Sequence, residues 1–291
     1  MTGNDVLELN AYAKLNLSLD VTGRRPDGYH EMKTVMVSVS LCDELTLRLT
    51  DDGAVRAQCS LPYVPTDGSN LACRAARLFF DRTGQPGLGA ALDIRKRIPV
   101  GAGMAGGSTD AAAVLRGLND RFGAPLDAAA LAALGRELGS DVPYCLAGGA
   151  ALGVGRGDEL TPLAPMPDCA VVICKPWFPI STPALFQRID QEKLRCHPDT
   201  EALCGALARG DLPSLARRMY NVFEDVLPRR CAAVLEIKRK LLELGALGAV
   251  MTGTGSAVFG LFDDDDAAHR AQETLHAEYR DCFLARPVQT V

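Results

Sequence analysis

The sequence lacks the features that would suit a nucleic acid or a membrane. Lysine and arginine number 31 against 36 aspartates and glutamates, so the 291-residue chain carries a net charge of -5 and no compensating basic stripe. No apolar run reaches the roughly 18 residues of a transmembrane helix. The N-terminal MTGNDVLELN has neither the basic nor the apolar region of a signal peptide. These absences predict a cytoplasmic protein with no nucleic-acid or membrane partner.

Metal-binding patterns are missing as well. Only four histidines are present, and none of the ten cysteines forms a Cys-x-x-Cys pair, so no zinc site and no other side-chain metal site is predicted. Most cysteines lie inside apolar runs, such as VVIC ending at Cys174 and CAAVL beginning at Cys231. Because nothing indicates export, we expect them to be reduced, small core residues.

The chain is long enough for two domains, and its 47% hydrophobic content allows a well-filled core. Alternating apolar and polar residues predict strands over 7–21, 32–41, 44–50 and 91–100, and helical periods follow at 70–84, 111–119 and 125–138. Three prolines in PLAPMPD, residues 162–168, mark a linker. Strands and helices then mix without strict βαβ alternation, which favours an α+β fold with domains at 1–161 and 162–291.

The glycine-rich segment PVGAGMAGGSTD, which starts at Pro99, is followed by the helical run AAAVLRGLN. Glycine allows a backbone to approach a ligand closely, and a turn that opens a helix presents free N–H groups at the positive end of the helix dipole. A phosphate site is therefore predicted, although a glycine-rich turn without a ligand is the simpler alternative. A Walker A loop is excluded because Gly107, not lysine, precedes Ser108. A dinucleotide fingerprint is disfavoured because the preceding strand alternates and Asp120 comes too early for the acidic partner. The phosphate loop of a small-molecule kinase remains.

Two charged residues are candidates for chemistry on a phosphoryl acceptor. Lys14 lies in the strand AYAKLNL, where it is either functional or on the polar side of a half-buried strand with Tyr12 and Asn16. Asp141, in LGSDVPYC, is either a general base for a hydroxyl group or a helix N-cap.

Three further segments have less specific patterns. The pair Tyr29–His30, after the turn RRPDG, could hold a base by stacking and hydrogen bonding or have no role. A second glycine loop, residues 253–256, could bind an anion or only turn a hairpin. The basic run RKR at 95–97 could attract a nucleotide or be a solvated strand edge.

Taken together, these segments resemble the GHMP kinase superfamily. Its N-terminal strand motif is matched by AKLNLSL, its phosphate loop by PVGAGMAGGSTDAA and its C-terminal glycine loop by MTGTGSAVFGLF. GRRPDGYHE, GSDVPYC and ISTPALF point to the branch that phosphorylates the 2-hydroxyl of a methylerythritol linked to cytidine by a diphosphate, on a route to isoprenoid precursors. The resemblance implies a two-domain α+β fold, with an N-terminal domain like the second domain of ribosomal protein S5 and a ferredoxin-like C-terminal domain.

The resemblance also assigns roles to residues of this chain. Asp141 matches the base, and Lys14 matches its partner, which would favour the alkoxide and offset charge on the transferring phosphoryl group. Asn16, Tyr29, His30, Thr182 and Phe186 match the substrate site, where Tyr29 and Phe186 would clamp a cytosine whose edge His30 reads. The ATP site would comprise Pro99, Val100, Gly101, Ala102, Gly103, Met104, Ala105, Gly106, Gly107, Ser108 and Thr109, with Asn70 and Leu71 lining the adenine pocket.

The resemblance implies ATP and Mg²⁺ as cofactors, with the ion held mainly by phosphates and water, and a monomer or a homodimer. Met104 replaces a commoner leucine, a volume-conserving change. Asp110 stands where some members have asparagine, and its carboxylate would repel the triphosphate unless it points away or meets Mg²⁺. Two alternatives stay open: a GHMP kinase for another alcohol, against which the RRPDGYHE run argues, and a non-catalytic ATP-binding sensor, against which Lys14 and Asp141 argue.

Overall fold

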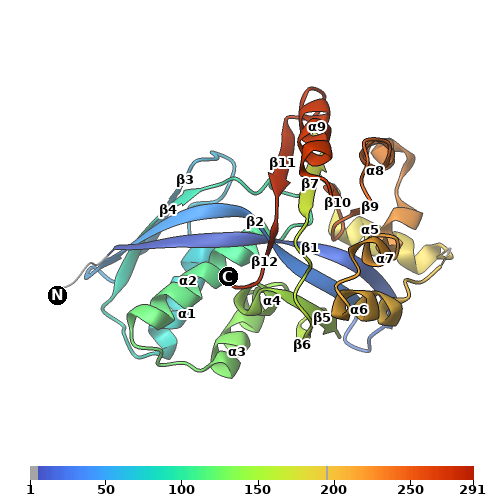
Figure 1. Cartoon of the computed structure of the whole chain (residues 1–291). Coiled ribbons are helices and arrows are strands. Elements are labelled where there is room, and N and C mark those ends of the chain that lie inside the picture. Colours follow the sequence, from blue (N-terminus) through green and yellow to red (C-terminus); the bar gives the residue numbers. More distant parts are fainter. Residues whose placement is uncertain (1–5, 195) are drawn as a thin grey trace.

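Two long antiparallel strands, β1 (Val6–Arg24) and β2 (His30–Thr50), form the central ribbon of the fold. The computed structural model describes residues 6–194 and 196–291 and shows this ribbon crossing most of the molecule (Figure 1). The predicted turn joins the two strands, and Gly28 has a positive φ of 85° that favours glycine. Both stretches of β2 that alternate in sequence belong to one continuous strand.

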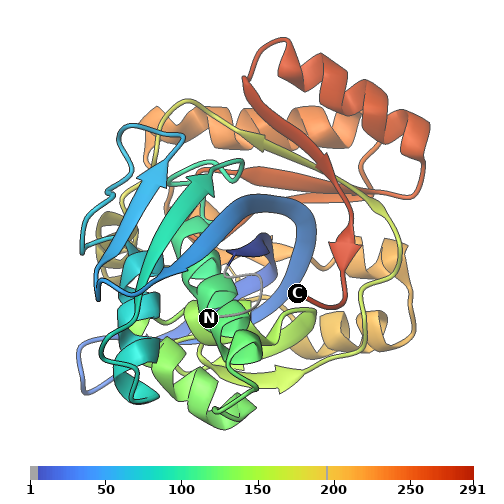
Figure 2. The same cartoon turned by 90° about the vertical axis from the view of Figure 1, so that its left-hand side faces the viewer.

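The first sheet is built along this ribbon. Its main path is β3–β4–β2–β1–β8, and β2 is long enough to pair also with β5 and β12. Four helices of the N-terminal half cover one face of this sheet, as Figures 1 and 2 show. The elements are β3 (Val55–Cys59), α1 (Leu71–Arg82), β4 (Gly89–Arg95), α2 (Gly106–Arg121), α3 (Ala128–Leu138), α4 (Val142–Ala147), β5 (Ala150–Val154), β6 (Glu159–Pro162), β8 (Tyr220–Asn221) and β12 (Pro287–Val288).

The second sheet has four antiparallel strands in the order β11–β7–β10–β9. With α8 between β7 and β9 and α9 between β10 and β11, this is the βαββαβ order of a ferredoxin-like module. The two helices cover its outer face (Figure 1). The elements are β7 (Ala170–Lys175), α5 (Thr182–Gln191), α6 (Thr200–Ala208), α7 (Leu212–Ala216), the short 3-10 helices η1 (Val222–Val226) and η2 (Arg229–Cys231), α8 (Ala232–Glu243), β9 (Gly248–Met251), β10 (Val258–Phe262), α9 (Asp265–His276) and β11 (Asp281–Ala285).

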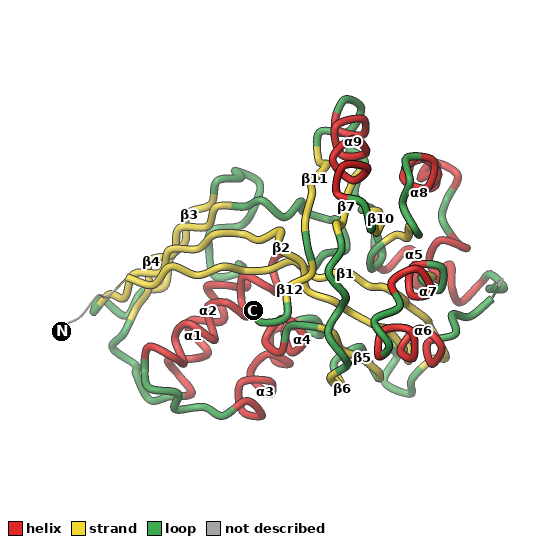
Figure 3. Tube along the Cα trace, in the orientation of Figure 1, coloured by secondary structure: helices red, strands yellow, loops and turns green. Residues whose placement is uncertain are grey.

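A shared core joins the two sheets. Because side chains alternate along a strand, Val171 and Ile173 of β7 pack toward Leu15 and Leu17 of β1, while Val172 packs beneath the helices. The chain also returns from the second sheet to the first through β12 (Figure 1). The predicted linker begins at the last residue of β6, Pro162, and continues as a loop to β7 (Figure 3); the domain boundary after residue 161 stays a prediction.

The cysteines are free, and six of the ten are buried. Burial raises the pKa of the Cys145 thiol and of the Cys169 thiol to about 12 in each case, with smaller contributions from Asp141 and Asp168, so both stay protonated near neutral pH. These buried thiols fit the expectation of small core residues. Within residues 6–194 and 196–291, no helix is long and apolar enough to cross a membrane.

Candidate active site

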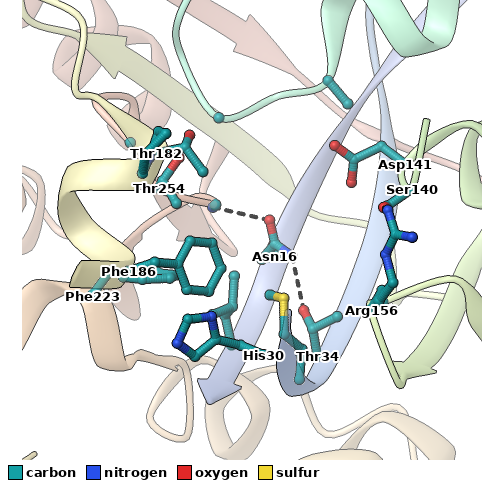
Figure 4. Close-up of a pocket in the computed structure, with 18 of the residues that line it drawn as sticks. Asn16, His30, Thr34, Ser140, Asp141, Arg156, Thr182, Phe186, Phe223 and Thr254 are labelled. Carbon is teal, nitrogen blue, oxygen red and sulfur yellow. Dashed lines mark hydrogen bonds between the residues drawn. The ribbon is translucent and has the colours of Figure 1, made fainter. Parts of the chain in front are cut away.

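A cleft of about 730 Å³ lies where β1, both glycine loops, the start of α4 and α5 meet (Figure 4). It collects residues from almost the full length of the chain. Ten of the predicted site residues line it: Lys14, Asn16, Tyr29, His30, Gly101, Gly103, Ala105, Asp141, Thr182 and Phe186.

Strand β1 positions Lys14 and Asn16 side by side. Alternation sends Leu15 into the core and leaves these two polar side chains on the other face, which is also almost fully buried. Lys14 Nζ donates to Asn16 Oδ1 at 2.7 Å, and Asn16 Nδ2 donates to Thr34 Oγ1 at 2.8 Å. The pairing of β1 with β2 shifts register on both sides of this pair, a feature frequent next to active sites. The buried ammonium is thus hydrogen-bonded and fixed in direction.

Asp141 faces Lys14 across the cleft. Its carboxylate oxygen Oδ1 lies 4.0 Å from Lys14 Nζ, and its side chain is 49% exposed. The residue occupies the N-cap position of α4, but its side chain accepts no capping hydrogen bond. The carboxylate therefore points toward the cleft (Figure 4), where it is free to accept a proton from a bound hydroxyl group.

The first glycine loop packs closely against the second. A Cβ on Gly103, whose φ is 79°, would lie 2.2 Å from the carbonyl oxygen of Thr252, so a larger residue would separate the loops. The amide of Gly253 donates to Asn16 Oδ1 at 2.9 Å, and Thr182 and Thr254 share a hydrogen bond of 2.7 Å. The second loop thus both connects β9 to β10 and forms part of the cleft.

The start of α2 lies beside the catalytic candidates. The amide of Lys14 donates to the carbonyl oxygen of Met104 at 3.3 Å, and α2 begins two residues later at Gly106. The positive end of the helix dipole and the N–H groups of its first turn suit a polyphosphate there. The predicted loop residues differ in burial: Ala102 and Met104 are buried, Ser108 is half-buried and Val100 is exposed.

Three predicted ATP-site residues mainly support the loop. Thr109 donates to the carbonyl oxygen of Tyr12 at 2.6 Å, which ties α2 to β1. Asn70 is the N-cap of α1: it accepts from the amide of Ala72 and donates to the carbonyl oxygen of Pro65. Leu71 lies next to Gly107. Of the loop, Pro99, Val100, Ala102, Met104, Gly106, Gly107, Ser108 and Thr109 are not among the residues that line the cleft, nor are Asn70 and Leu71.

Asp110 points away from the phosphate loop into a buried charge cluster. Its Oδ2 accepts from Lys96 Nζ at 2.7 Å, and Lys96 also pairs with the fully buried Asp43. Burial raises the pKa of Asp110 to about 7, against the attraction of Lys96 and with the repulsion of Asp43. The basic run therefore divides by role, since Arg95 and Arg97 are exposed and pair with Glu44.

An aromatic wall closes the far end of the cleft. His30 stacks on Phe186 with ring centroids 4.6 Å apart, and Phe186 meets the edge of Phe223 at 5.0 Å. The His30 ring is also held at its edge, because its Nε2 atom forms a 2.8 Å hydrogen bond with Asp190 Oδ1. One face of Phe186 is thus covered by His30, whereas the family resemblance implied that Phe186 and Tyr29 clamp a cytosine.

Several cleft residues were not predicted from the sequence. Thr34 hydrogen-bonds Asn16 and Asp190 hydrogen-bonds His30, while Thr252, which does not itself line the cleft, also hydrogen-bonds Asn16. Arg156 is the most conspicuous, because it is a guanidinium within the cleft. The sequence offered one indication of a role for Arg156, namely that this charged residue lies in the glycine-rich hairpin GVGRGDEL. Thr252 belongs to the matched C-terminal glycine loop, but its hydrogen bond to Asn16, 236 positions away, could not be predicted from the sequence.

Two family models match the chain. The model "GHMP kinases N terminal domain" covers residues 70–149, and "GHMP kinases C terminal" covers residues 203–281. A relative from Clostridium botulinum, named 4-diphosphocytidyl-2-C-methyl-D-erythritol kinase, is 41% identical over 282 residues, 97% of this chain and 100% of its own. A relative of the same name from Acetivibrio thermocellus is 39% identical, again over 97% of this chain and 99% of its own.

Solved structures agree with the family models. A crystal structure of 4-(cytidine 5'-diphospho)-2C-methyl-D-erythritol kinase matches with a TM-score of 0.82 and 39% identity over 97% of this chain and 99% of that one. A homoserine kinase from Cytophaga hutchinsonii matches with a TM-score of 0.74 at 19% identity over 100% of this chain and 97% of that one, which shows the fold alone. The chain belongs to the GHMP kinases and, among them, to the 4-diphosphocytidyl-2-C-methyl-D-erythritol kinase family.

Proposed function

We propose that the chain transfers the γ-phosphoryl group of ATP to the 2-hydroxyl of 4-(cytidine 5'-diphospho)-2-C-methyl-D-erythritol, in isoprenoid precursor synthesis. The observation that carries this proposal is the Asp141 carboxylate, half-exposed and 4.0 Å from the Lys14 ammonium, in a cleft that also contains the glycine loop. Phosphoryl transfer to an alcohol needs this combination of a base, a cation and a phosphate cradle.

In the proposed mechanism, Asp141 accepts the proton of the attacking hydroxyl as the new P–O bond forms and the bond between the γ-phosphorus and the oxygen of the leaving ADP breaks. Lys14 stabilises the developing alkoxide and the charge on the transferring group, because it is a buried cation whose position is fixed by Asn16. The amides at the start of α2, with the hydroxyl of Ser108 in its first turn, would hold the phosphates of ATP.

Mg²⁺ is expected to arrive bound to ATP, where it would neutralise phosphate charge. The described residues contain no group of three or more His, Cys, Asp or Glu side chains that could hold a metal, and the nearby Asp110 is already paired with Lys96. Phosphate oxygens and water, which Mg²⁺ accepts readily, are therefore the proposed ligands.

The acceptor test measures ADP release with MgATP and one of three acceptors: the cytidine-linked methylerythritol, mevalonate or homoserine. A fourth reaction without any acceptor is the control. Release only with the first supports the proposed reaction. Release with mevalonate or homoserine would keep the kinase chemistry and overturn the proposed acceptor. A folded protein that binds ATP but gives no release with any acceptor would favour an ATP-binding sensor.

Phe186 is proposed to stack on the cytosine, with Tyr29 on the other side and His30 moved from the ring face that it covers. Base stacking on an aromatic ring contributes about 1–3 kcal/mol, so Phe186→Ala should raise the KM for the acceptor by about 5- to 150-fold. The KM for ATP should not change. Phe186→Leu is the matched control, because it keeps apolar packing against Phe223 without an aromatic face. If both variants keep the wild-type KM for the acceptor, Phe186 does not stack on the base.

A further inference from the structure

Arg156 projects from the turn between β5 and β6 into the acceptor side of the cleft (Figure 4). Its guanidinium carbon lies 4.0 Å from the ring centroid of Tyr29, and its Nη2 donates to Ser140 Oγ at 2.8 Å. A planar cation on an aromatic face is held in one orientation. Ser140 directly precedes Asp141, so Arg156 spans the distance from the proposed base-binding residue to the proposed general base.

The charge of Arg156 is offset only at longer range, by the exposed carboxylate of Asp27, whose pKa it helps to lower. Within residues 6–194 and 196–291, no carboxylate forms an ion pair with it, whereas the neighbouring Lys14 is paired with Asp141. Its Nε is buried and has no hydrogen-bond partner. A buried donor without a partner is costly, and such groups in native proteins call for an explanation. An anion bound in the cleft would supply a counter-charge in direct contact with the guanidinium.

We propose that Arg156 binds the diphosphate of the acceptor, as the residue that selects a nucleoside diphosphate ester over an uncharged alcohol. This inference rests on the proposed function, in which a diphosphate connects the cytidine to the reacting alcohol. The base end is marked by Tyr29 and the hydroxyl end by Asp141, and Arg156 lies between them. A guanidinium is well suited to this task because its fork of N–H groups matches two phosphate oxygens.

The test is calorimetric binding of cytidine, CMP and CDP to the wild type, Arg156→Met and Arg156→Lys. The wild type should bind CDP more tightly than cytidine. Because hydrogen bonds to charged groups are the stronger class, Arg156→Met should weaken CDP binding by roughly 10- to 100-fold and leave cytidine binding unchanged. Arg156→Lys should recover part of the loss. In the kinase assay, the KM for the acceptor should rise and the KM for ATP should not.

Arg136→Met is the matched control, since Arg136 lies near Asp158 outside the cleft and should not alter CDP binding. Equal weakening of cytidine and CDP by Arg156→Met would overturn the inference, because the arginine would then only support Tyr29. Wild-type protein that binds CDP no better than cytidine would also overturn it and leave the proposed function standing. Wild-type protein that binds no cytidine compound at all would overturn both.

Discussion

Replacing Asp141 with asparagine should lower kcat by about 10²- to 10⁴-fold, the usual contribution of a general base. Asparagine keeps the shape of the side chain but cannot take the proton of the attacking hydroxyl. Folding should be unaffected, because the Asp141 carboxylate is half-exposed and accepts no capping hydrogen bond from α4. The measurements are ADP release at saturating substrates, the melting temperature and ATP binding.

A true helix cap in the same half of the molecule provides the control. Asp127 is the N-cap of α3 and accepts a hydrogen bond from the amide of Ala130 at 2.8 Å. Asp127→Ala should lower the free energy of unfolding by about 0.5–2 kcal/mol and leave kcat unchanged. If Asp141→Asn keeps wild-type turnover, or if Asp141→Ala acts only on the melting temperature as Asp127→Ala does, the general-base role is wrong.

The parts of the site predictable from the sequence are those encoded locally. Alternation along β1 places Lys14 and Asn16 on one face, and the glycine spacing from Gly101 to Gly107 marks a loop that opens a helix. The α+β class also follows from the order of the predicted elements, and the ferredoxin-like second sheet was implied by the family resemblance. The face of β1 and the glycine loop depend on residues close together in the chain, whereas the arrangement of the second sheet was available only through the resemblance.

The parts that the sequence could not supply depend on side chains meeting across the fold. His30 and Phe186 are 156 positions apart, and only the packing of α5 against the start of β2 stacks one ring on the other. The sequence also did not indicate that the Lys96 side chain points into the protein interior. It follows the last residue of β4, where strand alternation no longer fixes its direction, so a residue inside a basic run lies buried between two carboxylates.

This buried cluster leads to the prediction with the largest expected effect on stability. Lys96→Met removes the only ion-pair partner that the structure shows for Asp110 among the described residues and leaves Asp43 and Asp110 facing each other. Breaking a buried pair by removing one partner costs about 3–5 kcal/mol, a large share of the roughly 5–15 kcal/mol by which a domain is stable. Urea unfolding of the wild type and Lys96→Met measures the difference. Arg97→Met is the control, because Arg97 is exposed and its pair with Glu44 should contribute at most about 1 kcal/mol.

A second substitution separates lost charge from lost packing. Asp110→Asn in the Lys96→Met background removes one of the two uncompensated carboxylates, while Asp43 keeps the backbone hydrogen bonds from Arg97 and Ile98. The double variant should therefore be more stable than Lys96→Met alone. An equal or larger loss in the double variant would mean that the lysine acts by filling space. Recovery would show that Lys96 stabilises the fold by compensating the charge of Asp110.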